Sequence, residues 1–209
     1  AQIYMHIDKI KINNFKNYIS ATINFDDKIN FLYGKNGAGK TNLLDAIYYL
    51  SYGKSIVNNL DTDNINHSES FFTIEGSYSN NYIYKCTFEI PNKKKIYENE
   101  NKYKNLKEHI GKIPVVFVNP YDINLIRNYS NNRRRFFDQI FSQIDKKYLD
   151  SLIAYNRLIK QRNAYLKNLL SINDIDSNHI KSYDHKLITL NKYIGEKRKE
   201  EIKSFNSIF

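Results

Sequence analysis

Apolar residues recur at every second position in the first part of the chain, which predicts β-strands. Ile10 and Ile12 alternate with lysines, and Ile23 and Phe25 repeat this pattern after a polar break. The short apolar segment 29–33 then runs directly into Gly34. We therefore expect strands on both sides of the polar break and a further short strand at 29–33.

Helical spacing replaces this alternation after residue 40. Leu43, Ile47 and Leu50 fall on one face of a helix, with Leu44 and Tyr48 beside them. This pattern predicts an amphipathic helix that follows the segment 29–33 after a glycine-rich loop.

The middle of the chain returns to short strand patterns. FFTIEGSY and NYIYKCTFEI predict a β-hairpin with its turn at Ser79-Asn80-Asn81. The segment from residue 92 to 106 is compatible with a second hairpin that turns at 98–101. IPVVFVNP at 113–120 predicts a buried strand that ends at Asn-Pro.

Beyond Pro120 the pattern is helical. One apolar stripe lies within 133–144, and two heptad stripes are separated by the polar stretch SINDIDSN. The first heptad stripe, with Arg162 in its one interrupted position, consists of Tyr148, Leu152, Tyr155, Ile159, Leu166 and Leu169, and the second of Ile180, Tyr183, Leu187, Leu190 and Ile194. The stripes predict either an antiparallel helical hairpin or two amphipathic helices packed on the domain.

The stretch GKNGAGKT at 34–41 matches the phosphate-loop pattern G-x-x-x-x-G-K-[ST] in full. Successive backbone N–H groups must converge on phosphate oxygens, and glycine permits the positive φ angles that this requires. The following helix adds its positive N-terminal end. The residues predicted to hold a nucleoside triphosphate are Gly34, Lys35, Asn36, Gly37, Ala38, Gly39, Lys40 and Thr41.

Within this loop, two side chains have distinct predicted roles. Lys40 would place its ammonium against the β- and γ-phosphates, and Thr41 would offer its hydroxyl to Mg²⁺. The predicted ligands are therefore ATP and Mg²⁺, with Thr41 as the metal ligand.

Charge and cysteine content restrict the class of partner and the cysteine chemistry that we expect. The 32 basic and 22 acidic residues give a formal charge of +10, which favours a polyanionic partner, although a lysine-rich solvated surface would give the same value. The single cysteine, Cys86, excludes an intrachain disulfide and is expected to be a buried strand residue. No apolar run reaches the length of a membrane span, so we expect no membrane association and a cytoplasmic location.

Several motifs in order resemble the RecF family, which belongs to the SMC/Rad50-like class of ABC ATPases. The first runs from NNFKNY through the phosphate loop to SYGKS, and it includes Asn42 directly after Thr41. FVNPYDINLIRNYSNNRRRFFDQIFSQID and YNRLIKQRNAYLK continue the resemblance, which covers residues 6–205.

The resemblance implies an α/β fold, with a mixed sheet around the phosphate-loop helix, an antiparallel β-lobe and a helical subdomain. We expect an N-terminal ATPase lobe at 5–121 and a helical subdomain at 122–209 that is truncated at its end. The family's signature motif, Walker B aspartate and catalytic carboxylate are not found in this sequence. Whether the chain as given is an enzyme therefore stays open, and we expect weak nucleotide binding with negligible hydrolysis.

The resemblance also implies further site residues. Asn42 and Lys16 would contact the nucleotide, Lys16 from a turn at 14–18 that is otherwise an exposed β-turn. Asp122 lies where ABC ATPases place their Q-loop, or else caps the following turn. One departure from the family is Ile56-Val57, where His-Arg is common, which argues against a nucleotide contact from that loop.

DNA is the expected macromolecular partner, as single strands or gapped duplex junctions. The candidate contacts are Arg133, Arg134, Arg135, Lys160, Arg162 and Lys167, each of which could instead be a salt-bridged or solvated helix residue. In the family, ATP promotes a homodimer, and a RecR-like mediator protein is the implied protein partner.

Two functions remain open. The chain is either the ATP-binding part of a DNA repair and recombination protein that acts in gap repair, or a non-enzymatic DNA- or partner-binding module with nucleotide as a structural ligand. An ABC transporter ATPase would normally carry a glutamine after its buried strand, and VVFVNPYD has none.

Overall fold

The structure is a computed structural model that describes residues 5–123, 130–168 and 176–207. The chain divides into two compact units, residues 1–117 and 118–209.

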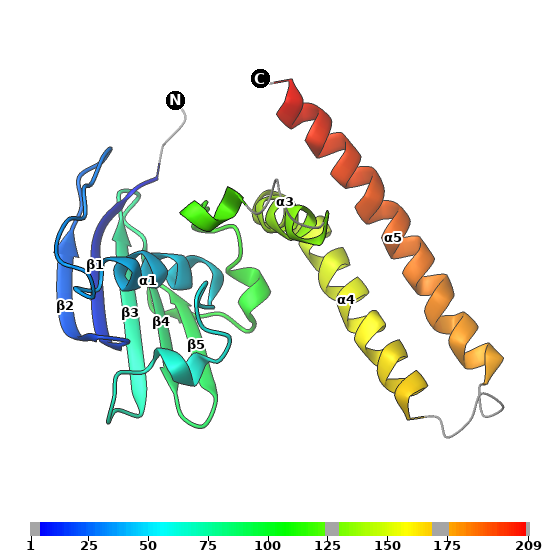
Figure 1. Cartoon of the computed structure of the whole chain (residues 1–209), viewed down its shortest axis with the longest axis horizontal. Helices are drawn as coiled ribbons and strands as arrows, with labels where there is room; N and C mark the ends of the chain where they lie inside the picture. Colours follow the sequence, from blue (N-terminus) through cyan, green and yellow to red (C-terminus); the bar gives the residue numbers. More distant parts are fainter. Residues whose placement is uncertain (1–4, 124–129, 169–175, 208–209) are drawn as a thin grey trace. The chain divides into compact units, whose positions relative to one another are not determined.

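The first unit is a six-stranded antiparallel sheet with one long helix on one of its faces (Figure 1). The strand order is β2-β1-β3-β4-β5-β6. The strands are β1 (Ile7–Phe15), β2 (Tyr18–Asn24), β3 (Phe71–Tyr78), β4 (Ile83–Glu89), β5 (Lys93–Glu98) and β6 (Asn101–Lys102), and the helix is α1 (Lys40–Tyr52). The alternating pattern of the sequence therefore predicts these strands and both hairpins correctly.

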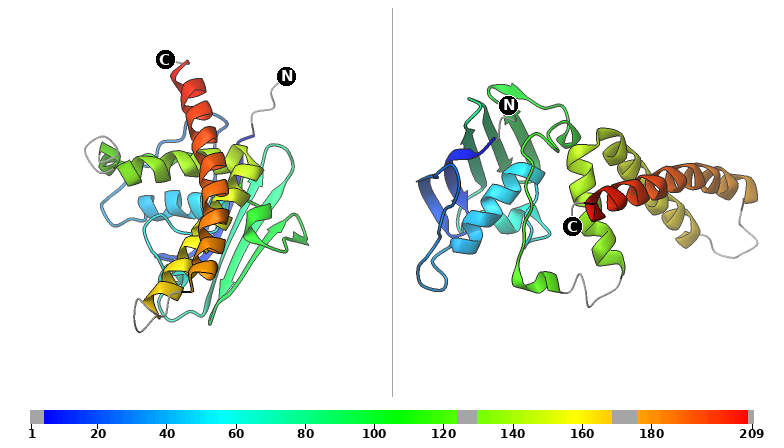
Figure 2. Two further views of the ribbon diagram at one scale, coloured as in Figure 1. Left: turned by 90° about the vertical axis from the view of Figure 1, so that its right-hand side faces the viewer. Right: turned by 90° about the horizontal axis from the view of Figure 1, so that it is seen from above.

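The core of this unit lies between α1 and the sheet (Figure 2). Every second residue of a strand points to this face, because side chains alternate across a pleated strand. Phe72 lies at its centre, with its ring in contact with those of Phe15, Tyr49 and Phe88. Cys86 is buried in β4 as expected, and this burial raises the pKa of its thiol to about 12.

Two apolar segments that the sequence predicts as strands are not strands. Segment 29–33 has no regular secondary structure, pairs with no strand among the described residues, and leaves its large side chains in solvent. Segment 113–118 passes α1 instead, where the Ser51 hydroxyl donates to the Ile113 carbonyl at 2.5 Å and Phe117 contacts Tyr48. A strand needs a partner for its backbone groups, and the described part of this chain provides none for either segment. The α/β fold is confirmed, but the described strands form an antiparallel sheet and not the mixed one we expected.

The second unit is helical. It contains α3 (Ser130–Ile144), α4 (Lys146–Lys167) and α5 (Ser177–Asn206), and short 3₁₀ turns in the chain lie at Asp61–Asn64, Leu106–Glu108 and Pro120–Ile123. The helices α4 and α5 run antiparallel side by side (Figure 1), which is the first of the two arrangements that the heptad stripes allow. Leu169 and most of the polar stretch between these helices lie outside the described residues.

A small polar and aromatic cluster holds these helices together. Phe141, Tyr148 and Ile194 form its buried core. The Arg198 guanidinium donates to both carboxylate oxygens of Asp138, at 2.9 and 2.8 Å, and the Tyr148 hydroxyl donates to the same carboxylate. A bidentate pair of this kind fixes orientation as well as distance. No helix in the described part of the chain is both long and apolar enough to cross a membrane.

Candidate nucleotide-binding site

The loop between residue 33 and α1 has the backbone shape that its glycines permit. Gly34, Gly37 and Gly39 have φ angles of +146°, +80° and +101°, in the region that L-residues rarely occupy. The Ala38 N–H donates to the Lys35 carbonyl at 3.3 Å, which closes the tip of the loop. The residues from Gly34 to Ala38 are exposed, so a ligand can reach them.

Lys40 closes the base of the loop. Its Nζ donates to the carbonyl oxygens of Gly34 and Lys35, both at 2.8 Å. An ammonium group has three N–H donors, so these two bonds leave one for an anion held in the loop. The Lys40 ammonium therefore lies against the loop backbone, where its positive charge is available to an anion held in the loop.

The first turn of α1 is open to an anion. Its N-cap residue is Gly39, whose position has no side-chain cap, and no acidic residue lies in the first turn. The backbone N–H groups and the helix dipole at such an end favour a negatively charged ligand. Thr41 is exposed in this turn, so its hydroxyl is available to a metal ion that is also bound by phosphate. Among the described residues, no three His, Cys, Asp or Glu side chains gather as a metal site of their own.

The turn between β1 and β2 lies directly against the end of the loop. The Tyr18 hydroxyl donates to the Gly39 carbonyl at 3.2 Å, and burial raises the pKa of this hydroxyl, so it stays protonated. The Asn42 amide donates to the Asn17 side-chain oxygen at 2.8 Å. A Cβ atom added to Gly39 would lie 2.7 Å from Asn17 Nδ2. Gly39 is therefore favoured by its φ angle, and a side chain at this position would also displace the Asn17 amide.

Lys16, which we expected to contact the nucleotide, is engaged elsewhere. Its Nζ lies 2.5 Å from a carboxylate oxygen of Asp45, and the two side chains are 9 % and 0 % exposed. The interaction with Asp45 would have to be given up before Lys16 could reach a ligand. No sequence motif points to Asp45, although it is the only charged residue of α1 after Lys40.

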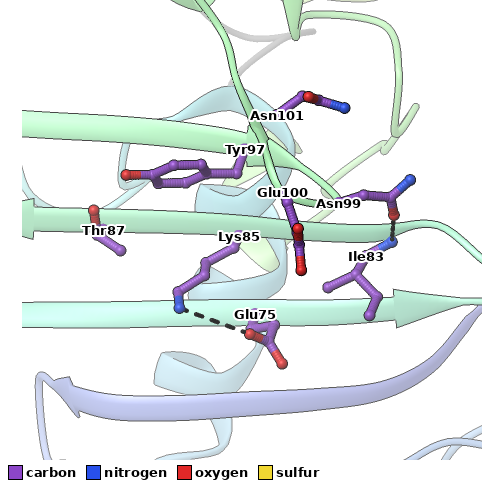
Figure 3. A pocket seen from close by; sticks show the side chains of 8 residues that line it. All are labelled: Glu75, Ile83, Lys85, Thr87, Tyr97, Asn99, Glu100 and Asn101. Carbon is purple, nitrogen blue, oxygen red and sulfur yellow. Dashed lines mark hydrogen bonds and ion pairs between the residues drawn. The ribbon is translucent and has the colours of Figure 1, made fainter.

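The hollows of the first unit include one beside the phosphate loop and one on the sheet face opposite α1. One, of about 220 Å³, adjoins the phosphate loop and is lined by Tyr18, Phe31, Leu32, Tyr33, Ala38, Lys40 and Leu43. The other, of about 900 Å³, is an open depression over β3, β4 and β5, on the sheet face opposite α1 (Figure 3). Its lining contains the Glu75–Lys85 ion pair at 4.0 Å and the Asn99 side chain, which accepts a bond from the Ile83 N–H at 2.9 Å. The residues that line this depression include no glycine and no helix N-terminus of the kind found at the phosphate loop.

The remaining candidate residues lie in the second unit. The Asp122 carboxylate accepts from the Asn119 N–H at 2.7 Å, so it caps the local 3₁₀ turn. Arg133, Arg134 and Arg135 are exposed near the start of α3, and Arg134 bonds the Ser130 hydroxyl and the Asn131 side chain. Arg162 pairs with Asp184 of α5 at 2.8 Å, whereas Lys160 and Lys167 are exposed on α4.

Comparison with known proteins gives both a family and a fold. Residues 9–208 match the family described as AAA domain. The chain is 42 % identical over 208 residues to the DNA replication and repair protein RecF of Flavobacterium johnsoniae, covering 98 % of this chain and 58 % of that protein. A solved structure described as the recombination mediator protein RecF-ATPrS in the RecFOR pathway has a TM-score of 0.89 at 28 % identity, covering 95 % of this chain and 54 % of that one.

A more distant structure, from a study of ATP-driven dimerization of SMC ATPases, has a TM-score of 0.55 at 17 % identity and covers 65 % of this chain and 99 % of that one. At this identity it is evidence of a shared fold alone. The chain spans little more than half of the length of the RecF proteins it matches. It belongs to the AAA-domain family, and its relatives in both sequence and fold are RecF proteins.

Proposed function

We propose that this chain is the ATP-binding part of a RecF-like DNA replication and repair protein. The observation that carries the proposal is the phosphate loop, where positive-φ glycines, the Lys40 ammonium and the uncapped start of α1 meet at an exposed site. Lys40 would contact the β- and γ-phosphates. A magnesium ion bound to these phosphates would take the Thr41 hydroxyl as a ligand and would neutralise part of their charge.

A calorimetric titration with ATP and magnesium tests this proposal. Substitution of Lys40 by Ala removes a charged donor, which costs about 1.5–3 kcal/mol, so Kd should rise from about tenfold to more than a hundredfold. Lys28→Ala, which removes an exposed charge outside the loop, is the control and should leave Kd unchanged. Equal affinity of wild type and Lys40→Ala would contradict the proposal.

We propose further that this chain alone does not hydrolyse ATP at a useful rate. Hydrolysis needs a carboxylate that orients water at the γ-phosphate, but Asp45, the one carboxylate of α1, is fully buried and bonded to other groups. The family's catalytic carboxylate and signature motif are not found in this sequence. Robust steady-state turnover that Lys40→Ala abolishes would show this part of the proposal to be wrong.

DNA binding belongs to the same proposal, with Arg133, Arg134 and Arg135 as its main contacts. Their exposure near the start of α3, together with exposed Lys160 and Lys167, supports this assignment. Arg162 is a weaker candidate because it pairs with Asp184. Asp122, as a Q-loop residue, and Lys16, as a nucleotide contact, remain proposals inherited from the family resemblance, as do an ATP-dependent homodimer and a RecR-like partner.

Salt dependence separates this function from a module that binds DNA without using nucleotide. If phosphate contacts dominate, the logarithm of the DNA affinity should fall linearly with the logarithm of the salt concentration, and the triple change of Arg133, Arg134 and Arg135 to Gln should flatten that slope. If the affinity for DNA is the same with and without ATP, and also in Lys40→Ala, the nucleotide-independent alternative is correct.

A further inference from the structure

The Asp45 carboxylate connects three segments of the first unit. Its Oδ2 lies 2.5 Å from Lys16 Nζ and accepts a bond from the Ser55 hydroxyl at 2.7 Å. Its Oδ1 accepts the backbone N–H of Ile56 at 2.8 Å. The turn between β1 and β2, the second turn of α1 and the loop that follows α1 are thus fixed to a single side chain.

The backbone of Lys16 is fixed as firmly as its side chain. Lys16 has a φ angle of +52°, which is uncommon for a residue with a side chain. Its N–H donates to the Asn64 carbonyl at 2.8 Å, and its carbonyl accepts from the Asn66 amide at 2.6 Å. These two hydrogen bonds hold the backbone of Lys16 in this strained conformation.

The next two residues, Asn17 and Tyr18, are those that contact the phosphate loop and the first turn of α1. Asn17 meets Asn42, and Tyr18 meets Gly39. The Lys16–Asp45 ion pair therefore adjoins these contacts along the chain, because Lys16 precedes Asn17 and Asp45 lies three residues after Asn42 on α1.

A buried ion pair adds little net stability, because removing two charges from water costs about as much as their attraction returns. Its directional bonds can nevertheless fix a local geometry. We propose that Lys16 and Asp45 are positioning residues of the nucleotide site, which hold Asn17 and Tyr18 against Gly39 and Asn42 so that the exit of the phosphate loop is ordered before ATP binds. This inference rests on the proposed ATP binding by the same loop.

The direction in which each variant changes the affinity for ATP distinguishes positioning from a simple charge effect. If the pair acted only through its electric field, Lys16→Met would weaken ATP binding, whereas Asp45→Asn would strengthen it by leaving a positive charge near the phosphates. If the pair positions the turn, both variants weaken binding. The double variant Lys16→Met/Asp45→Asn, which is neutral at both positions, should also bind weakly.

The experiment measures Kd for magnesium ATP by calorimetry, with the folded fraction of each variant checked by thermal unfolding. We expect Kd to rise about tenfold for Lys16→Met, for Asp45→Asn and for the double variant. The matched control is the Lys94–Asp61 ion pair of the same unit, at 2.6 Å. Lys94→Met should lower the unfolding temperature and leave Kd within about twofold of wild type.

An exposed variant keeps the test decisive if the buried ones fail to fold. Asn17→Ala leaves the ion pair intact and should weaken ATP binding. Its effect and that of Lys16→Met should not be additive, because both act through the same contacts. Wild-type affinity in the folded variants, or stronger binding by Asp45→Asn, would overturn the proposal, whereas a wild-type chain that binds no ATP would instead overturn the proposed function.

Discussion

On its exit side the phosphate loop leads into α1, and on its entry side it follows segment 29–33. The exit is supported by the protein: Gly39 is buried beneath Asn17 and Tyr18, and α1 packs on the sheet. The entry is not, since Phe31 and Tyr33 are 86 % and 93 % exposed and the segment pairs with no strand among the described residues. A ligand that contacts both sides would meet packed protein only at the exit, which is a physical reason to expect weak nucleotide binding.

The largest expected difference between the two sides is in stability. Phe72→Ala removes a fully buried ring beneath α1 and should lower the unfolding free energy by about 3–5 kcal/mol. Phe31→Ala, on the entry side, should change it by less than about 0.5 kcal/mol. Urea denaturation monitored by circular dichroism measures both. A comparable loss in Phe31→Ala would mean that the entry segment is buried in solution.

The glycines of the loop give a smaller contrast. Alanine at Gly39 combines a φ of +101° with a contact of 2.7 Å to Asn17 and should cost about 2–3 kcal/mol of stability. Alanine at Gly37, with a φ of +80° and no atom within 4 Å of the added Cβ, should cost about 1 kcal/mol. Thermal unfolding without nucleotide compares the two. Addition of Asn17→Ala should recover part of the loss in Gly39→Ala only.

The smallest difference concerns single hydroxyl groups. Tyr18→Phe removes one of two hydrogen bonds to the Gly39 carbonyl, which keeps the Leu43 N–H as a donor at 2.9 Å, and should cost about 1 kcal/mol or less. Tyr33→Phe, on the exposed entry segment, should have no measurable effect on stability. Equal effects of the two substitutions in the same unfolding assay would remove the proposed distinction between the exit and the entry.

The contrast also explains what the sequence could and could not predict. Alternation along β1, β3 and β4 and the helical stripe of α1 identify these elements, because each buries one face against a neighbour in the described chain. Segments 29–33 and 113–118 show the same apolar character but form no strand. Hydrophobicity indicates that a segment is suited to burial, and it does not indicate whether a partner is present.

The site was predictable to a similar degree. The spacing of Gly34, Gly39, Lys40 and Thr41 identifies the phosphate loop, because backbone geometry at a phosphate demands those residue types. The support beneath it was not predictable. The contact between Lys16 and Asp45 joins residues of a β-turn and a helix, and no local pattern specifies such a pair. The one available signal was that Asp45 is the only acidic residue of α1.

A titration of the ¹⁵N-labelled chain with magnesium ATP, followed by backbone amide NMR, tests the central claim most directly. The account predicts that the largest shifts occur at the amides of Gly37, Gly39, Lys40 and Thr41, with smaller shifts at Asn17, and that Lys40→Ala strongly reduces them. Shifts confined to the opposite face of the sheet, around Lys85 and Tyr97, or no saturable shifts at all, would contradict it.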